Sequence, residues 1–148
     1  MTRTPRHDET LEILMDLSRL IRSLSRVMGT DEEGPAMTAT QRLAFFELGE
    51  GALRLNDLAD RMGVSPPTAS RSVDALYELG LVERVPDPQD RRALRIELTP
   101  SGKELLADRK AKAQAAFAPA VALLSASERK TLSELLRRMA DGVRAARP

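Results

Sequence analysis

The stretch from Ser65 to Leu98 constrains the fold of this chain more than any other part. It reads SPPTASRSVDALYELGLVERVPDPQDRRALRIEL, a short helical pattern followed directly by a two-stranded hairpin pattern with an arginine-rich turn. A helix of this size fits a DNA major groove roughly 12 Å wide, and a hairpin beside it reaches the backbone or the minor groove. The pairing therefore predicts a DNA-binding unit, and the other helices have to account for dimerisation and control.

The predicted DNA-reading helix has its own start and stop signals. Ser65 is a natural N-cap, and Pro66 suits the first helical position because its missing N–H would be unpaired there anyway. Gly80 supplies the C-terminal stop. The predicted inward face consists of Ala69, Val73, Leu76 and Leu79. The first turns then expose Pro67, Thr68, Ser70 and Arg71.

A second short helix precedes this one and completes a helix-turn-helix pattern. Residues 55–62 place leucine, alanine and methionine on one side and polar residues on the other, and Gly63 ends the helix. The small residue Ala59 lies four positions before Gly63, which suits two helices that cross closely through a tight turn. After Gly80, a turn rich in proline and aspartate separates Val82 from a strand in which apolar and charged residues alternate up to Leu98.

Helical patterns flank this unit on both sides. Apolar residues recur at helical spacing from Leu11 to Met28. A Gly/Pro-rich break then leads to Thr38 or Thr40, either of which can cap a helix that ends near Gly49. That helix is predicted to carry Leu43, Ala44, Phe46 and Leu48 on its apolar side. After the strand, Thr99 and Pro100 begin a long helix that bends or ends near Pro119, and a last helix begins at about Ser127.

Composition excludes several classes of function. The chain has 148 residues, the length of one ordinary domain, and it has no cysteine, which removes disulfides, thiolate zinc sites and cysteine-based sensing. The single histidine, His7, precedes the first helix, and no nucleophile, base and orienting group form a recognisable motif, so neither a metal, a cofactor nor an enzyme is expected. No signal peptide or membrane span is apparent, which predicts a soluble cytoplasmic protein.

Charge alone does not indicate nucleic acid, because the formal net charge is only +1. Within the candidate unit, acidic residues balance the arginines in number, so the arrangement has to carry the prediction. Asp74, Glu78 and Glu83 fall in the later part of the helix and beyond it. Its first turns are free of acidic residues, and only these turns would meet base edges.

The segment DPQDRRALRIELTPSGKEL resembles the wing of the MarR family of multiple-antibiotic-resistance regulators. The family pattern Asp-x-x-Asp-Arg-Arg, followed by alternating strand residues and Leu-Thr-x-x-Gly, corresponds here to Asp87, Asp90, Arg91, Arg92, Leu98, Thr99 and Gly102. The resemblance covers nearly the whole chain. It implies a single domain over residues 1–148 that is mostly α with a small β-hairpin wing. Residues of about 8–28 and 100–146 would form dimerisation helices, and residues of about 38–98 a winged helix-turn-helix lobe.

The resemblance also implies a function. A homodimer would place its recognition helices in successive major grooves of a pseudo-palindromic operator and its wings in the flanking minor grooves, most simply as a repressor that responds to a ligand. A small aromatic effector between the dimer helices and the DNA-binding lobe would lie near Leu17, Ile21 and Phe46. The alternative is a winged-helix module that binds another protein without specific DNA binding.

The candidate DNA contacts are Ser65, Pro67, Thr68, Ser70, Arg71, Arg91 and Arg92. Arg71 could be a solvated helix charge, but the family pattern Thr-x-Ser-Arg favours a DNA contact. An arginine at a hairpin tip can enter a narrow minor groove. The resemblance implies that Asp87 or Asp90 braces the wing by holding one guanidinium while another reaches DNA; Arg91 is favoured for the DNA contact.

Overall fold

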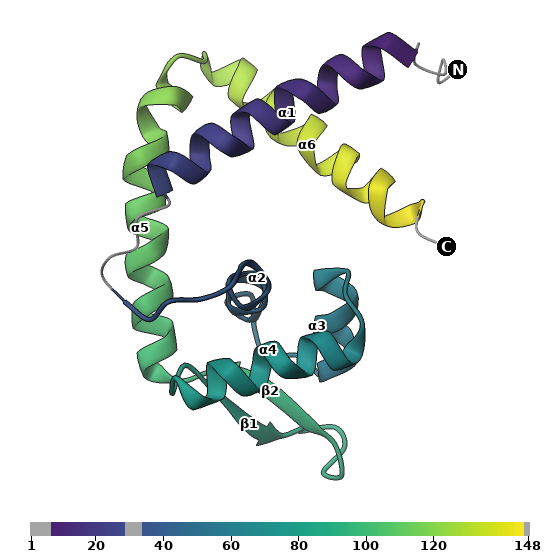
Figure 1. Cartoon of the computed structure of the whole chain (residues 1–148), viewed down its shortest axis with the longest axis vertical. Coiled ribbons are helices and arrows are strands. Elements are labelled where there is room, and N and C mark those ends of the chain that lie inside the picture. The colour runs from purple at the N-terminus through teal and green to yellow at the C-terminus, as the bar shows by residue number, and fades with distance from the viewer. Residues whose placement is uncertain (1–6, 29–33, 147–148) are drawn as a thin grey trace. The chain divides into compact units, whose positions relative to one another are not determined.

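The computed structural model describes residues 7–28 and 34–146 (Figure 1). Their elements follow the order α1 (His7–Met28), α2 (Ala39–Leu48), α3 (Leu55–Met62), α4 (Pro66–Glu78), β1 (Val82–Pro86), β2 (Leu94–Leu98), α5 (Pro100–Ala122) and α6 (Ala126–Ala145). The protein is therefore mostly helical with one small antiparallel hairpin, which confirms the predicted fold class. The chain divides into two compact units. The winged unit is described from Gly34 to Ala111, and the helical unit contains α1, α5 from Lys112 onward and α6.

The winged unit has one hydrophobic core, to which α2, α3, α4 and both strands contribute. Its largest fully buried side chains are Phe45, Leu58, Leu76, Val73 and Val82. In α2 the prediction of the apolar side was partly wrong, because Leu43 is exposed, Phe46 is half-buried and Phe45 takes the central place. On a helix, Phe45 lies one residue from Ala44 and three from Leu48, so these three share one face.

The helices α3 and α4 form the predicted helix-turn-helix pair. Gly63 ends α3 in the left-handed conformation with φ 66°, and its N–H binds the Asp60 carbonyl at 3.1 Å. Ser65 caps α4, with a proline at the first helical position. Leu79 was predicted to face the core but is 42% exposed, because α4 ends at Glu78 and the chain turns through Gly80. Leu81 is buried just after this turn.

The wing is the antiparallel pair of β1 and β2, in which Val82 pairs with Leu98 and Pro86 with Leu94. Ile96 of β2 also pairs with Leu53, with backbone hydrogen bonds of 3.0 and 2.8 Å in the two directions. The segment between α2 and α3 therefore adds a one-residue antiparallel bridge beside β2. This pairing fastens the wing to the start of the helix-turn-helix.

Thr99 joins the start of α5 to the end of α4. Its hydroxyl donates to the Gly80 carbonyl at 2.7 Å and accepts from the Gly102 N–H at 3.0 Å. Gly102 then lies so close to Leu81 that an added Cβ would be 2.1 Å from the Leu81 carbonyl oxygen. Further along, α5 continues through Pro119 to Ala122, and Ser125 and Glu128 exchange hydrogen bonds in a capping box at the start of α6.

Replacing Thr99 by alanine is expected to lower the free energy of unfolding by about 1–2 kcal/mol, because a helix cap and a second hydrogen bond are lost together. Urea unfolding followed by circular dichroism measures the change. The matched variant Thr99→Ser keeps the hydroxyl and should stay close to the parent chain. Equal losses in both variants would assign the effect to the methyl group and not to the cap.

The helical unit leaves a large apolar surface exposed on a single chain. On α6 this surface consists of Leu132, Leu135, Leu136, Met139 and Val143. On α1 it includes Leu11, Leu14, Met15, Leu20 and Ile21. Within residues 7–28 and 34–146, no helix combines the length and the apolar composition that a membrane span requires.

Candidate nucleic-acid interface

Three polar side chains are linked along the start of α4. The hydroxyl oxygens of Ser65 and Thr68 lie 2.9 Å apart, and Nη2 of Arg71 donates to the Thr68 hydroxyl at 3.3 Å. Their spacing of three residues keeps them on one side of the helix. Ser65 and Arg71 are exposed, whereas Thr68 is half-buried. The helix therefore presents a guanidinium and two hydroxyls beside the unpaired N–H groups of its first turn, a chemistry suited to phosphate and base edges.

The other two candidates on α4 lie beside this row. Pro67 is exposed and Ser70 is half-buried. Neither makes a side-chain hydrogen bond within the part of the chain that the structure describes. The Pro67 ring can therefore make an apolar contact with DNA, and the Ser70 hydroxyl can donate or accept a hydrogen bond. All five candidates on the helix thus come from its first two turns.

Arg84 was not among the predicted site residues. It extends from β1 to the outer side of α4, where Nη2 forms an ion pair with Oδ1 of Asp74 and the guanidinium carbon lies 5.3 Å from the centre of the Tyr77 ring. The ion pair compensates the negative charge on the exposed side of the helix, and the ring contact adds a cation–π interaction. Arg84 thereby fixes the wing strand against α4. The spacing of Asp74 and Tyr77 places both on one face of the helix, which the sequence could have shown. Arg84 reaches them only because β1 packs beside α4 in the folded chain.

Asp87 is the anchor of the wing turn. Its side chain is 1% exposed, and its Oδ2 accepts a hydrogen bond of 2.7 Å from Nε of Arg54. Nε of Arg95 lies 3.3 Å from the same oxygen, and the Gln89 N–H donates to Oδ1 at 2.8 Å. The hydrogen bond from Arg54, followed by that from Gln89, lowers the pKa of the Asp87 carboxyl below its ordinary 3.8. The same bond raises the pKa of Arg54.

Asp90 shapes the turn through the backbone. Its Oδ1 accepts from the Arg92 N–H at 3.0 Å, and its carbonyl accepts from the Ala93 N–H at 2.9 Å. The expectation that an aspartate of the motif holds Arg91 or Arg92 is corrected by these contacts, since the partners of Asp87 are Arg54 and Arg95. Both Arg91 and Arg92 are exposed, and neither guanidinium forms an ion pair with any described residue.

The contribution of Asp87 to stability should depend on pH. Because its pKa is lowered in the folded chain, the stabilisation is fully present above the ordinary value of 3.8 and is lost as the pH falls through the folded value. The variant Asp87→Asn should therefore be less stable than the parent at neutral pH, and the difference should shrink in acid. Thermal unfolding of both chains over this pH range measures it. A difference that stays constant down to strong acid would show that the ionised carboxylate contributes nothing.

The residues expected near an effector lie in both units. Leu17 and Ile21 are on α1, half-buried and exposed respectively. Phe46 lies at the margin of the winged core, where its ring and that of Phe45 meet edge to face. One turn after Ile21, Leu24 lines a hollow of about 450 Å³ in the helical unit. The other residues lining it are Ala113, Gln114, Phe117, Ala118, Val121, Ala122 and Arg129.

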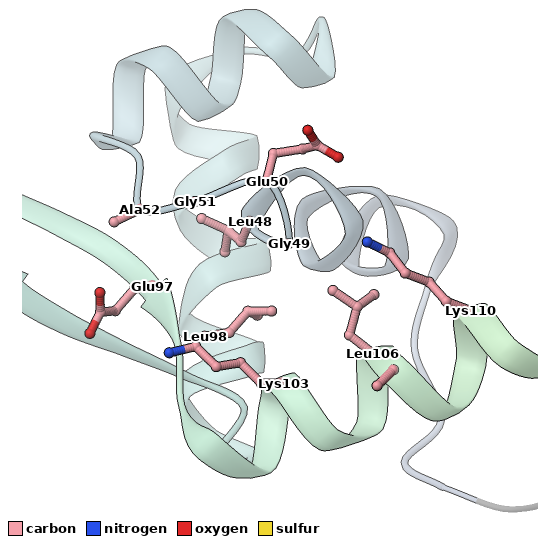
Figure 2. A pocket seen from close by; sticks show the side chains of 11 residues that line it. Leu48, Gly49, Glu50, Gly51, Ala52, Glu97, Leu98, Lys103, Leu106 and Lys110 are labelled. Atoms are coloured by element: carbon pink, nitrogen blue, oxygen red, sulfur yellow. The ribbon is translucent and has the colours of Figure 1, made fainter.

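A second hollow, of about 400 Å³, belongs to the winged unit (Figure 2). Leu48 and Gly49 at the end of α2 form one wall, Leu106 of α5 the other, and Lys103 and Lys110 flank it along α5. Its residues are not among those predicted to bind DNA. Within the described ranges, no three histidine, cysteine, aspartate or glutamate side chains are grouped so that they could hold a metal ion.

Comparison with known proteins identifies similar chains over most of this length. A family model described as the MarR family matches residues 37–93. An HTH-type transcriptional regulator of Mycobacterium tuberculosis is 32% identical over 135 residues, 90% of this chain and 92% of the relative. The HTH-type transcriptional repressor MdtR of Bacillus subtilis is 30% identical over 105 residues, 68% of each chain. The crystal structure of a probable transcriptional regulator from Pseudomonas aeruginosa has 31% identity and a TM-score of 0.64, and the match covers 90% of this chain and 99% of that one.

Proposed function

This chain belongs to the MarR family of DNA-binding transcriptional regulators, and on that premise we propose that it acts as a homodimeric repressor on a pseudo-palindromic DNA site. The observation that carries the proposal is the joint exposure of the first turns of α4 and of Arg91 and Arg92 in the wing turn. The helix would enter a major groove, and a wing arginine the minor groove beside it. Ser65, Pro67, Thr68, Ser70 and Arg71 would make the contacts from the helix.

The apolar surface of the helical unit supports the homodimer. Large side chains on α1 and α6, such as Leu14 and Leu136, are 58% and 43% exposed on the single chain. Exposed apolar surface of this kind is typical of an interface between protein chains. Two copies related by a two-fold axis would set the two α4 helices about one DNA turn apart, roughly 34–36 Å, and would cover a site of about 16–20 bp.

Repression is proposed because the relative MdtR is a repressor, and repression requires only that the bound dimer occupy the promoter. A small aromatic effector near Leu17, Ile21 or Phe46 stays a prediction. Such a ligand would release the operator only by preferring a dimer whose α4 helices are wrongly spaced, and a tenfold loss of affinity needs about 1.4 kcal/mol of preference. The absence of enzymatic activity also stays a prediction, as the relatives are transcriptional regulators.

The test is binding of the purified protein to the DNA immediately upstream of its own gene, titrated at several salt concentrations beside an unrelated duplex. Salt has to vary because phosphate contacts release counterions and strengthen binding to every sequence. We expect the upstream duplex to contain a site bound about 10³-fold or more tightly than the unrelated one. Equal binding to both, followed by failure to select any preferred sequence from random duplexes, would favour a protein-interaction module instead.

A further inference from the structure

We propose that Arg54 and Arg95 form a second contact to DNA, a clamp at the base of the wing that grips a backbone phosphate. The inference rests on the proposed DNA-binding function and adds a site to it. Neither arginine is part of the helix start or of the wing tip. We refer to the pair, held by Asp87, as the Arg54–Arg95 clamp.

The two guanidinium groups are held by one atom. Nε of Arg54 and Nε of Arg95 lie 2.7 and 3.3 Å from the same Oδ2 of Asp87. The other oxygen of that carboxylate is occupied by the Gln89 N–H at 2.8 Å. Both oxygens of the Asp87 carboxylate therefore have partners, and the two arginines approach it through their Nε atoms only.

The outer nitrogens of both arginines are available. The side chains are 42% and 35% exposed, and their Nη atoms have no hydrogen-bond partner among residues 7–28 and 34–146. A guanidinium carries five N–H donors in a planar fork that matches the oxygens of a phosphate. With Nε lying beside Asp87, each group keeps the outer edge of that fork for an incoming anion.

The charges of the cluster also call for an anion. Two guanidinium groups lie within ion-pair distance of a single carboxylate, that of Asp87, whereas Asp90 and Asp57 act on Arg54 only from farther away. Nε of Arg95 is buried and makes no hydrogen bond in the described structure, although it lies within ion-pair distance of Asp87. Only Arg54 therefore forms a hydrogen bond with the Asp87 carboxylate. A second anion that accepts hydrogen bonds from the outer nitrogens would give both guanidinium groups an acceptor.

The position of the clamp identifies that anion as a phosphate of DNA. Arg54 is the N-cap residue of α3, the first helix of the helix-turn-helix, and its side chain makes no cap hydrogen bond. Asp87 begins the turn that carries Arg91 and Arg92. The clamp therefore joins the two parts that would contact DNA, and the first helix of such a unit crosses the sugar–phosphate backbone.

The test is the salt dependence of DNA binding by Arg54→Gln and Arg95→Gln in the full-length protein. If each protomer loses one phosphate contact, the slope of log K against log salt should decrease in magnitude by about 1.8 for the dimer. The loss of affinity should be the same for the preferred site and for an unrelated duplex, because phosphates carry no sequence information. Lys103→Gln removes the same charge from the winged unit outside the clamp and should leave the slope close to that of the parent.

Two outcomes would overturn the clamp. One is a slope in both variants equal to that of Lys103→Gln, with the parent chain still binding DNA. The other is found with duplexes in which single phosphates beside the site are replaced by neutral methylphosphonates. Replacing a phosphate held by the clamp should weaken DNA binding by the parent and not by Arg95→Gln. If every such replacement weakens both proteins equally, the arginines only brace the wing. Failure of the parent itself to bind any duplex would refute the proposed function instead.

If Arg54→Gln does not fold because Asp87 loses its main partner, Arg95→Gln still decides the question. Arg95 makes no hydrogen bond to Asp87, so its replacement costs the turn less. Circular dichroism and the oligomeric state of each variant establish that it is folded before its DNA binding is compared.

Discussion

Replacing Arg91 and Arg92 together by alanine is expected to weaken binding to the preferred DNA site by about 10³-fold. Both side chains are exposed at the tip of the wing turn. A direct DNA contact is worth about 1–3 kcal/mol, and a homodimer loses the wing contact twice, so about 4 kcal/mol should disappear at about 2 kcal/mol for each wing. Equilibrium titration of the labelled site by fluorescence anisotropy at fixed salt measures the loss.

The folded state should not change in this variant. The backbone of the turn is held by Asp87 and Asp90, which bind N–H groups and do not depend on the two guanidinium groups. The unfolding midpoint and the oligomeric state should therefore match those of the parent. Lys103→Ala with Lys110→Ala removes as many positive charges from α5 and is the matched control. If the control loses as much DNA affinity as the wing variant, the loss is due to the change in net charge and not to a contact made by the wing.

Much of the fold could be predicted because its signals are local. Ser65 with Pro66, and Thr99 with Pro100, marked the starts of α4 and α5 through side-chain chemistry that needs only neighbouring residues. The alternation around Ile96 likewise marked β2 as a strand with one buried face. The details that were wrong, Leu79 and Phe45, depend on where a helix ends and which side it turns to the core.

The candidate site was predictable only in part, because several of its contacts join distant residues. Arg54 and Asp87 are 33 positions apart, and no local pattern pairs them. Arg84 and Asp74 are 10 positions apart and meet only after α4 has packed on β1. By number alone, the acidic residues and arginines of this unit cancel. The structure shows that they differ in position, because Asp87 is buried while Arg91 and Arg92 lie at the surface.

The wing cannot select a two-fold site unless the dimer fixes the spacing of its two copies, so the apolar face of α6 should control DNA binding from a distance. Leu132 and Leu136 lie one turn apart on that face and are each 43% exposed on the single chain. Replacing both by glutamine puts four polar side chains into the proposed interface. If each costs about 1 kcal/mol or more, the dimer should dissociate at least about 10³-fold more readily.

Glutamine leaves the net charge unchanged, so a loss of DNA affinity in this variant cannot be electrostatic. Lys130→Gln with Glu134→Gln is the matched control, because both positions lie on the opposite side of α6 and their charges cancel. Sedimentation equilibrium should find the leucine variant monomeric at concentrations where the control is dimeric. The monomer should still bind DNA weakly through one α4 and one wing, with only about half the salt slope of the parent. A leucine variant as dimeric as the control would place the interface elsewhere on the helical unit.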